Sequence, residues 1–186
     1  QAMRSKTFIF LPVFLLLIFG ISSCYRYIDA TNGDTVIEQG SLKFYSDSNL
    51  FAYKTNIIAT RDKEMIYPKY FEVTLPKKIK YYEFINSTDF GFYYEKGQVI
   101  FIKIELDSKI QSKDTTYIPS TEKLDEFIQL VIKTNGKKLD IKKITASKGR
   151  RNFIIIKGDA TILLYNIIND NLKQFLDDLN SFKFIN

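Results

Sequence analysis

The side chains available for chemistry in this chain are carboxylates, hydroxyls and lysines, because histidine is absent and the only cysteine is Cys24. Histidine is the usual general base near neutral pH and the commonest metal ligand. Its absence excludes serine–histidine triads, cysteine–histidine dyads and most zinc or copper sites. No glycine-rich phosphate loop is present either. We therefore expect no cofactor and no bound metal, and what remains is carboxylate chemistry or binding without catalysis.

The carboxylates show no spacing that indicates an acid–base pair. Asp177 and Asp178 are adjacent on an expected helix, whereas helical residues that converge lie three or four positions apart. Asp107 and Asp114 lie in a polar loop that lacks the regular ligand spacing of a calcium site. A hydrolase that uses carboxylates alone stays open as an alternative, without named catalytic residues.

Cys24 ends the stretch MRSKTFIFLPVFLLLIFGISSC, which begins at Met3. The stretch starts with two basic residues, continues as an uncharged apolar run over residues 8–19 and ends with small residues. This is the layout of a secretory signal peptide. The run is shorter than the ~20 residues that a membrane-spanning helix requires. We expect residues 1–23 to be a signal peptide, with the two residues before Met3 as an extension.

The last four residues of this stretch, Ile21-Ser22-Ser23-Cys24, resemble the lipobox of bacterial lipoproteins. In that family the cysteine thiol receives a diacylglycerol, the peptide is cut just before it, and the new amino terminus is usually acylated. The resemblance implies that Cys24 is the lipidation site and that acyl chains, palmitate among them, form a membrane anchor. Several chains, at about 0.8 kcal/mol per buried methylene, hold a protein stably on a bilayer.

The composition adds an expectation about location. Together with the lipobox, the abundance of Ile, Lys, Asn, Phe and Tyr is similar to that of small lipoproteins of the Bacteroidetes type. Surface-exported members of that group carry an acidic tract after the cysteine, which residues 25–29 lack. We therefore expect a protein of the cell envelope, anchored in the outer membrane and facing the periplasm. The net charge is +6 for the whole chain and +4 without residues 1–23, because Arg4 and Lys6 leave with them and 25 basic and 21 acidic residues remain. This charge is mild, and nucleic acid is not an expected partner.

A basic segment runs from Lys133 to Arg151 and contains a single acid, Asp140. Lysines of this kind can be a solvated strand edge, where they discourage edge-to-edge pairing. They can also form a patch for anionic lipid, acidic glycan or an acidic protein face. The candidate anion-binding residues are Lys142, Lys143, Lys148, Arg150 and Arg151. Aromatic residues that could either stack on sugars or belong to the core are Tyr81, Tyr82, Tyr93, Tyr94 and Phe101.

The strands that would position these residues are predicted from period-two alternation. One β-hairpin is expected over residues 90–106 with its turn at 95–97, and a second over residues 151–167 with its turn at 157–159. The second strand of the latter hairpin is apolar on both faces, which is typical of a central strand covered on both sides. Weaker strand candidates are residues 41–46, 70–75, 79–85 and 139–145, with a terminal edge strand at 182–185.

Two helices are predicted from apolar residues at i, i+3, i+4 and i+7, over residues 124–131 and 172–179. Each has one apolar stripe and a polar back, so each should lie on a sheet. The expected fold class is α+β, a mainly antiparallel β-sheet with two amphipathic helices packed against it. We expect residues 24–35 to be the lipidated cysteine and a tether, and residues 36–186 to be a single α+β domain.

The function expected from these features is that of a lipid-anchored cell-envelope protein, a non-catalytic binding or assembly module. Its partners would be the membrane, through the lipid on Cys24, and an anionic lipid, glycan or acidic protein. Two alternatives stay open. One is a carboxylate-based envelope hydrolase, and the other is an inhibitor or immunity-type lipoprotein, whose sequence would look the same.

Overall fold

The protein, seen in a computed structural model, has an α+β fold built mainly from antiparallel strands, with two helices. The structure describes residues 27–31, 34, 36–39, 42–54, 59–61, 64–66, 69–85, 88–105, 113–133 and 148–185. Within them the strands form two large sheets and one short ribbon. The expected fold class is confirmed at this level.

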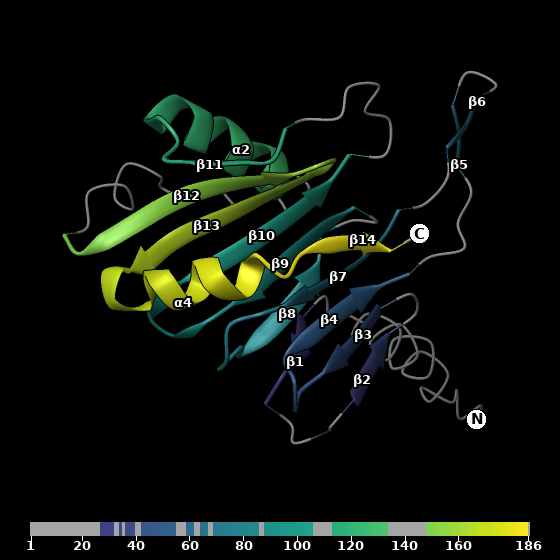
Figure 1. The fold of residues 1–186 in the computed structure, drawn as a ribbon, viewed down its shortest axis with the longest axis horizontal. Helices are drawn as coiled ribbons and strands as arrows, with labels where there is room; N and C mark the ends of the chain where they lie inside the picture. Colours follow the sequence, from purple (N-terminus) through teal and green to yellow (C-terminus); the bar gives the residue numbers. More distant parts are fainter. Residues whose placement is uncertain are drawn as a thin grey trace, which may run out of the picture.

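Seven strands form the larger sheet (Figure 1). In spatial order they are β1 (Tyr27–Asp29), β8 (Tyr81–Phe84), β9 (Asp89–Tyr93), β10 (Val99–Ile104), β13 (Ala160–Ile168), β12 (Arg150–Lys157) and β11 (Thr115–Tyr117). The smaller sheet has the order β14 (Lys183–Ile185), β7 (Tyr70–Thr74), β4 (Leu50–Tyr53), β3 (Leu42–Tyr45) and β2 (Val36–Gln39). The ribbon pairs β5 (Ala59–Arg61) with β6 (Glu64–Ile66).

Both predicted hairpins are present. β9 and β10 are joined by the 3-10 turn η2 (Glu95–Gly97), and β12 and β13 by a turn at residues 158–159. In the first hairpin Phe92 lies opposite Ile100 and Phe90 opposite Ile102, so both strands send the same apolar face toward the core. Because side chains alternate along a strand, this register places every second residue of the hairpin on the inner face, and the residues between them face outward.

The face of the larger sheet that packs against the five-stranded sheet is filled by aromatic and branched aliphatic side chains. Phe51 of β4 is fully buried, and its ring centroid lies 5.7 Å from that of Phe90 and 4.7 Å from that of Phe92. The helix α4 (Asn169–Leu179) contributes buried side chains to the same cluster. We call this cluster the inner core, and it joins the two sheets and α4 into one unit.

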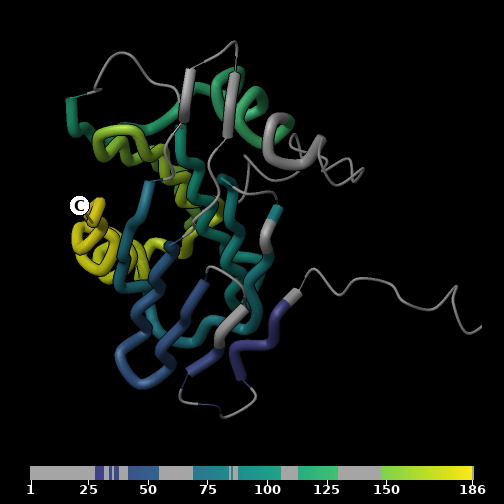
Figure 2. The backbone as a smooth tube through the Cα atoms, turned by 90° about the vertical axis from the view of Figure 1, so that its right-hand side faces the viewer, coloured from purple at the N-terminus to yellow at the C-terminus, as the bar shows by residue number. Residues whose placement is uncertain are grey.

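The opposite, outer face of the larger sheet is covered in its middle by α2 (Thr121–Lys133). Figure 2 shows the layers, with the five-stranded sheet and α4 on one side of the larger sheet and α2 on the other. β13 is therefore buried on both faces, as its continuous apolar sequence predicts. The side chains packed under α2 come from three strands of the sheet: Phe101, Ile154, Leu163 and Tyr165.

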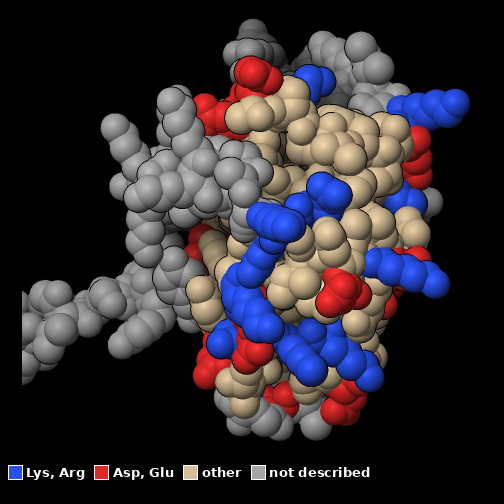
Figure 3. Space-filling model, turned by 90° about the vertical axis from the view of Figure 1, so that its left-hand side faces the viewer, with Lys and Arg blue, Asp and Glu red and all other residues tan. Residues whose placement is uncertain are grey.

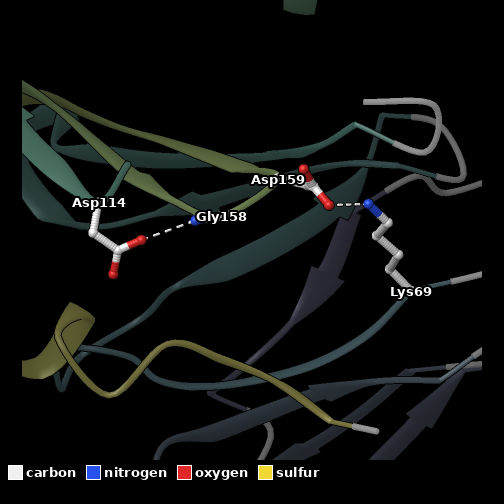
Figure 4. A network of polar contacts seen from close by, with 4 residues as sticks. All are labelled: Lys69, Asp114, Gly158 and Asp159. Atoms are coloured by element: carbon white, nitrogen blue, oxygen red, sulfur yellow. Dashed lines mark hydrogen bonds and ion pairs between the residues drawn. The ribbon is translucent and has the colours of Figure 1, made fainter. Parts of the chain in front are cut away.

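Polar contacts hold the β12–β13 turn to neighbouring segments (Figure 4). Lys69, which precedes β7, forms an ion pair with Asp159 in this turn. Asp114, which precedes β11, accepts a hydrogen bond on Oδ1 from the N–H of Gly158 at 3.0 Å. Because Lys69 leads into the smaller sheet and Asp159 belongs to the larger one, this ion pair is a polar link between the two sheets.

The larger sheet begins earlier in the chain than the sequence predicts. Within residues 24–35, expected to be a tether, Tyr27–Asp29 forms β1 and pairs with β8 at the edge of the sheet. Ile28 packs against the inner core. A three-residue strand is too short to show alternation, so its pairing with a distant strand leaves no local signal. The three-residue strand β11 was missed for the same reason, and the four-residue strands β2 and β4 were not predicted either. The strand candidate at residues 139–145 lies outside the described residues.

Candidate anion-binding surface

Arg150 begins β12, is half-buried and is held by backbone carbonyls. Its Nη1 donates hydrogen bonds to the carbonyl oxygens of Lys96 at 2.9 Å and of Asn166 at 2.8 Å. Hydrogen bonds from a charged donor are stronger than neutral ones. Arg150, which the sequence predicts to contact a partner, therefore has one guanidinium nitrogen engaged in tying η2 to β13.

Gln98 extends this polar network and is only 4% exposed. Its Oε1 accepts hydrogen bonds from the N–H of Ile168 at 3.1 Å and from Nδ2 of Asn171 at 3.0 Å. Asn166, which has a positive φ of 57°, donates from Nδ2 to the carbonyl of Gly97 at 2.9 Å. The network fixes the end of the molecule at which η2, the start of β12 and the start of α4 meet.

Four exposed basic residues lie at this end, in the segments that the network holds or that adjoin it. We call them the basic end: Lys80, Lys96, Lys148 and Arg151. The carbonyl of Lys96 accepts a hydrogen bond from Arg150, and Nζ of Lys80 lies 3.7 Å from Oε1 of Glu95 in the same turn. Figure 3 looks at this end of the molecule and shows Lys and Arg side chains gathered across it. Three segments far apart in the sequence thus contribute to one positive surface.

The basic end is only weakly neutralised by its own acidic neighbour. The side chains of Lys80 and Glu95 are 50% and 64% exposed, and exposed ion pairs of this kind contribute about 0–1 kcal/mol. Within the described part of the chain, Lys96, Lys148 and Arg151 form no ion pair. The surface therefore attracts anions over about one Debye length, ~8 Å at physiological ionic strength.

The structure places three of the predicted anion-binding residues and adds two that the sequence analysis did not name. Lys148 and Arg151 are exposed, and Arg150 lies between them in the network. Lys142 and Lys143, like Cys24, lie outside the described residues. Lys80 and Lys96 were missed because counting charges along the chain does not show which turns meet in space. The available signal was the predicted turn at residues 95–97, which contains a lysine.

Most of the aromatic residues considered for sugar stacking are buried in the folded protein. Three of them are buried: Tyr82, Tyr94 and Phe101. Tyr81 is 36% exposed, and its ring stacks on that of Tyr93 with 4.7 Å between centroids. Because Tyr81 directly follows Lys80, an aromatic ring adjoins the basic end.

Two buried carboxylates lie on the outer face in neighbouring strands, Glu83 of β8 at 3% exposure and Asp89 of β9 at 6%. Thr88 donates a hydrogen bond from Oγ1 to Asp89 at 3.3 Å. Glu83 lies opposite Gly91, where an added Cβ would come within 3.1 Å of the Tyr93 ring. The ring of Tyr93 therefore fills the space over Gly91. The sequence analysis did not single out these two carboxylates.

In the part of the chain that the structure describes, no group of three or more metal-binding side chains is present. No helix among the described residues has the length and apolar character needed to cross a membrane. Comparisons with protein families, with curated proteins and with solved structures each found no match to this chain.

Proposed function

We propose that this chain is a lipid-anchored cell-envelope protein whose folded part is a non-catalytic binding module for an anionic partner. The observation that carries the binding role is the basic end, where exposed charges from three segments gather on one surface. The anchor rests on Cys24, the only cysteine, which stands directly after the small residues that end the signal-peptide pattern. In this proposal the anchor lies in the outer membrane and the folded part faces the periplasm.

The fold serves this function as a rigid frame. We treat both helices as amphipathic covers of the sheets, which the burial of Leu124, Ile128 and Phe175 supports. The hydrogen bonds of Arg150 and Gln98 hold η2, β12 and α4 together at the basic end. A fixed backbone reduces the entropy lost when charged side chains engage a partner.

Charge-matched variants test the binding role. One variant reverses the charge of three lysines of the basic end: Lys80→Glu, Lys96→Glu and Lys148→Glu. The control variant reverses the charge of three exposed lysines elsewhere: Lys54→Glu, Lys113→Glu and Lys183→Glu. Both variants have the same net charge. On a phosphate-bearing matrix the basic-end variant should elute at clearly lower salt than the control. Positive charges gathered on one surface bind the phosphate groups more strongly than the same number of charges spread over the protein. Equal elution of the two variants would overturn the binding proposal.

Intact mass spectrometry of the protein from its native host tests the anchor. The expected product begins at Cys24 and carries acyl chains, so its mass exceeds that of the unmodified chain from residue 24 by the mass of the lipid. A free thiol at Cys24, or a mature amino terminus at another residue, would remove the anchor from the proposal.

A hydrolase that uses Glu83 and Asp89 is the second candidate, because these two carboxylates are buried on neighbouring strands. Incubation of the purified protein with envelope glycan tests it directly. A hydrolysis rate that falls about 100-fold or more in Glu83→Gln or Asp89→Asn would favour this candidate, since removal of a general acid or base costs ~10²–10⁴-fold. No hydrolysis by the unmodified protein is the result that the binding proposal expects.

A further inference from the structure

The covalent distance between the expected lipid and the sheet is short. Cys24 precedes Tyr27, the first residue of β1, by three positions. An extended chain spans at most ~3.3–3.6 Å per residue, so the two residues are separated by no more than about 11 Å. A lipid on Cys24 therefore holds the β1 edge of the larger sheet close to the bilayer that contains it.

The β1 edge adjoins the basic end. Asp29 of β1 lies opposite Tyr81 of β8, and the N–H of Ala30 donates to the carbonyl of Lys80 at 3.0 Å. Ala30 follows Cys24 by six positions, a span of at most about 22 Å. β1 runs toward the basic end, so the lipid is attached beyond the start of the strand, whereas the hydrogen bond to Lys80 lies past its other end, within about 22 Å of chain.

The side chains at this edge suit the head-group region of a membrane. Tyr81 is 36% exposed and directly follows Lys80. Tyrosine is enriched at membrane–water interfaces, where its ring and its hydroxyl each meet a matching environment. A tyrosine beside lysines, on the edge that leads to the lipid, has the composition of an interfacial contact.

Charge decides which lipid this surface prefers. Each lysine or arginine near an anionic leaflet gains on the order of 1 kcal/mol, and this attraction falls off within a Debye length. Three acidic side chains oppose it: Glu95, which pairs with Lys80; Asp170, exposed in the first turn of α4; and Asp29, whose pKa is lowered by hydrogen bonds from the hydroxyl and N–H of Thr31. Four basic residues against these three leave the surface positive.

We propose that the basic end binds the anionic phospholipid head groups of the same membrane that holds the lipid anchor, so that the folded part stands on the bilayer with its basic end against it and its β1 edge within reach of the anchor. This inference rests on the proposed anchor and names the anionic partner. The lipid supplies the attachment, and the basic end sets the orientation. The opposite end, with the β12–β13 turn, then faces away from the membrane.

Lysine footprinting of the mature, lipidated protein tests the orientation. The protein is placed on phosphatidylcholine vesicles with or without about 30 mol% phosphatidylglycerol, and its amines are labelled and quantified by mass spectrometry. On the anionic vesicles Lys80, Lys96 and Lys148 should react roughly fivefold more slowly than on neutral vesicles. Lys54, Lys113 and Lys183 should react equally on both. About 0.5 M salt should remove the difference, because it shortens the Debye length to ~4 Å.

A variant pair shows whether the contact depends on the basic end itself. In Lys80→Glu, Lys96→Glu, Arg151→Glu the remaining Lys148 serves as the probe, and it should lose its protection on anionic vesicles. In the control Lys54→Glu, Lys113→Glu, Lys183→Glu the protection of Lys148 should persist. Equal protection of Lys148 in the two variants would overturn the inference.

The outcomes also separate this inference from the proposed function. Protein that floats with neutral vesicles but shows no lipid-dependent protection retains the anchor and overturns the orientation. Protein that does not float with neutral vesicles overturns the anchor. Protection that appears only after an acidic glycan or an acidic protein is added would assign the basic end to that partner and overturn the membrane contact.

Discussion

The two faces of the seven-stranded sheet are made by alternate residues of the same strands, yet they differ in composition. The inner face of β9 and β10 presents Phe90, Phe92, Ile100 and Ile102, all fully or almost fully buried. Their neighbours on the outer face include charged side chains as well as apolar ones: Asp89, Phe101 and Lys103. The inner face must fill the space between two sheets, whereas α2 covers only the middle of the outer face.

The inner face therefore stabilises the fold, whereas the margins of the outer face and the basic end are available for contact with a partner. The inner core is continuous from the five-stranded sheet to α4, so a change there affects the whole fold. Charged and exposed groups are placed on the margins of the outer face and at the basic end, where substitution leaves packing intact. Substitutions on the two sides of this division should therefore differ in how much they lower the free energy of unfolding.

Truncation on the inner face should have the largest effect. Phe92 is fully buried and contacts the ring of Phe51, so Phe92→Ala should lower the free energy of unfolding by about 3–5 kcal/mol. Tyr81→Ala on the outer face should cost about 1–2 kcal/mol, because Tyr81 is 36% exposed and loses mainly its stacking on Tyr93. Urea denaturation measures both. Similar losses in the two variants would contradict the division between the faces.

Two adjacent arginines give the second test. Arg150→Ala should lower the free energy of unfolding by about 1.5–3 kcal/mol, since two carbonyls lose a charged hydrogen-bond donor. Arg151 is exposed, and Arg151→Ala should change stability by no more than about 0.5 kcal/mol. Thermal and urea unfolding of the pair check this. A cost at Arg151 as large as that at Arg150 would show that Arg151 also belongs to the structural network.

Removing the hydroxyl of three buried tyrosines should have a smaller effect on the free energy of unfolding than Arg150→Ala, and in the opposite direction. The hydroxyls of Tyr82, Tyr94 and Tyr165 contact no hydrogen-bond partner among the described residues. Burial raises the pKa of each of these phenols. Tyr→Phe at each position should leave stability unchanged or raise it by up to about 1 kcal/mol, because a desolvated hydroxyl is removed. A loss above about 1 kcal/mol would show that the hydroxyl has a partner, such as an ordered water.

Asp178, at the α4 margin of the inner core, should give the smallest effect. Its pKa is raised, first by burial and then by the carboxylate of Asp177. The folded state therefore binds the proton more tightly than the unfolded state, and stability falls as the pH rises through the window between the two pKa values. At pH 7 Asp178→Asn should gain a few tenths of a kcal/mol, since the group is only half-buried and its interactions are partly screened by solvent.

The gain from Asp178→Asn should disappear below about pH 3.9, where the carboxyl is protonated in both states. Urea denaturation at the two pH values measures it. An advantage that persists at low pH would assign the effect to helix propensity or packing rather than to charge. Asn180, an exposed residue after the same helix, offers a control site at which Asn180→Ser should show no pH-dependent change.

The parts of the fold that were predicted correctly have strong local periodicity. The hairpin β9–β10, the hairpin β12–β13 and the two helices each repeat an apolar pattern over several turns or residue pairs. The short strands β1 and β11 were not predicted, because three residues give too few repeats and their partners lie far along the chain. Periodicity identifies an element, whereas pairing depends on contacts that are distant in sequence.

The candidate site was only partly predictable for the same reason. The sequence named Lys148, Arg150 and Arg151 as basic residues close together in the chain. It did not show that β10 pairs with β13, which brings the η2 turn and its lysine beside Arg150. Nor did it show that Arg150 is held by two carbonyls while Arg151 is exposed.

The sequence by itself determined the alternation that builds the hairpins, the stripes that build the helices, and the absence of histidine and of a second cysteine, because these are properties of residue type and spacing. The tertiary structure decided which face of each strand is buried between two sheets and which turns meet at one end. The order of the strands determines which turns meet, because Lys80, Lys96 and Arg151 share a surface only after β8, β9, β10, β13 and β12 have paired.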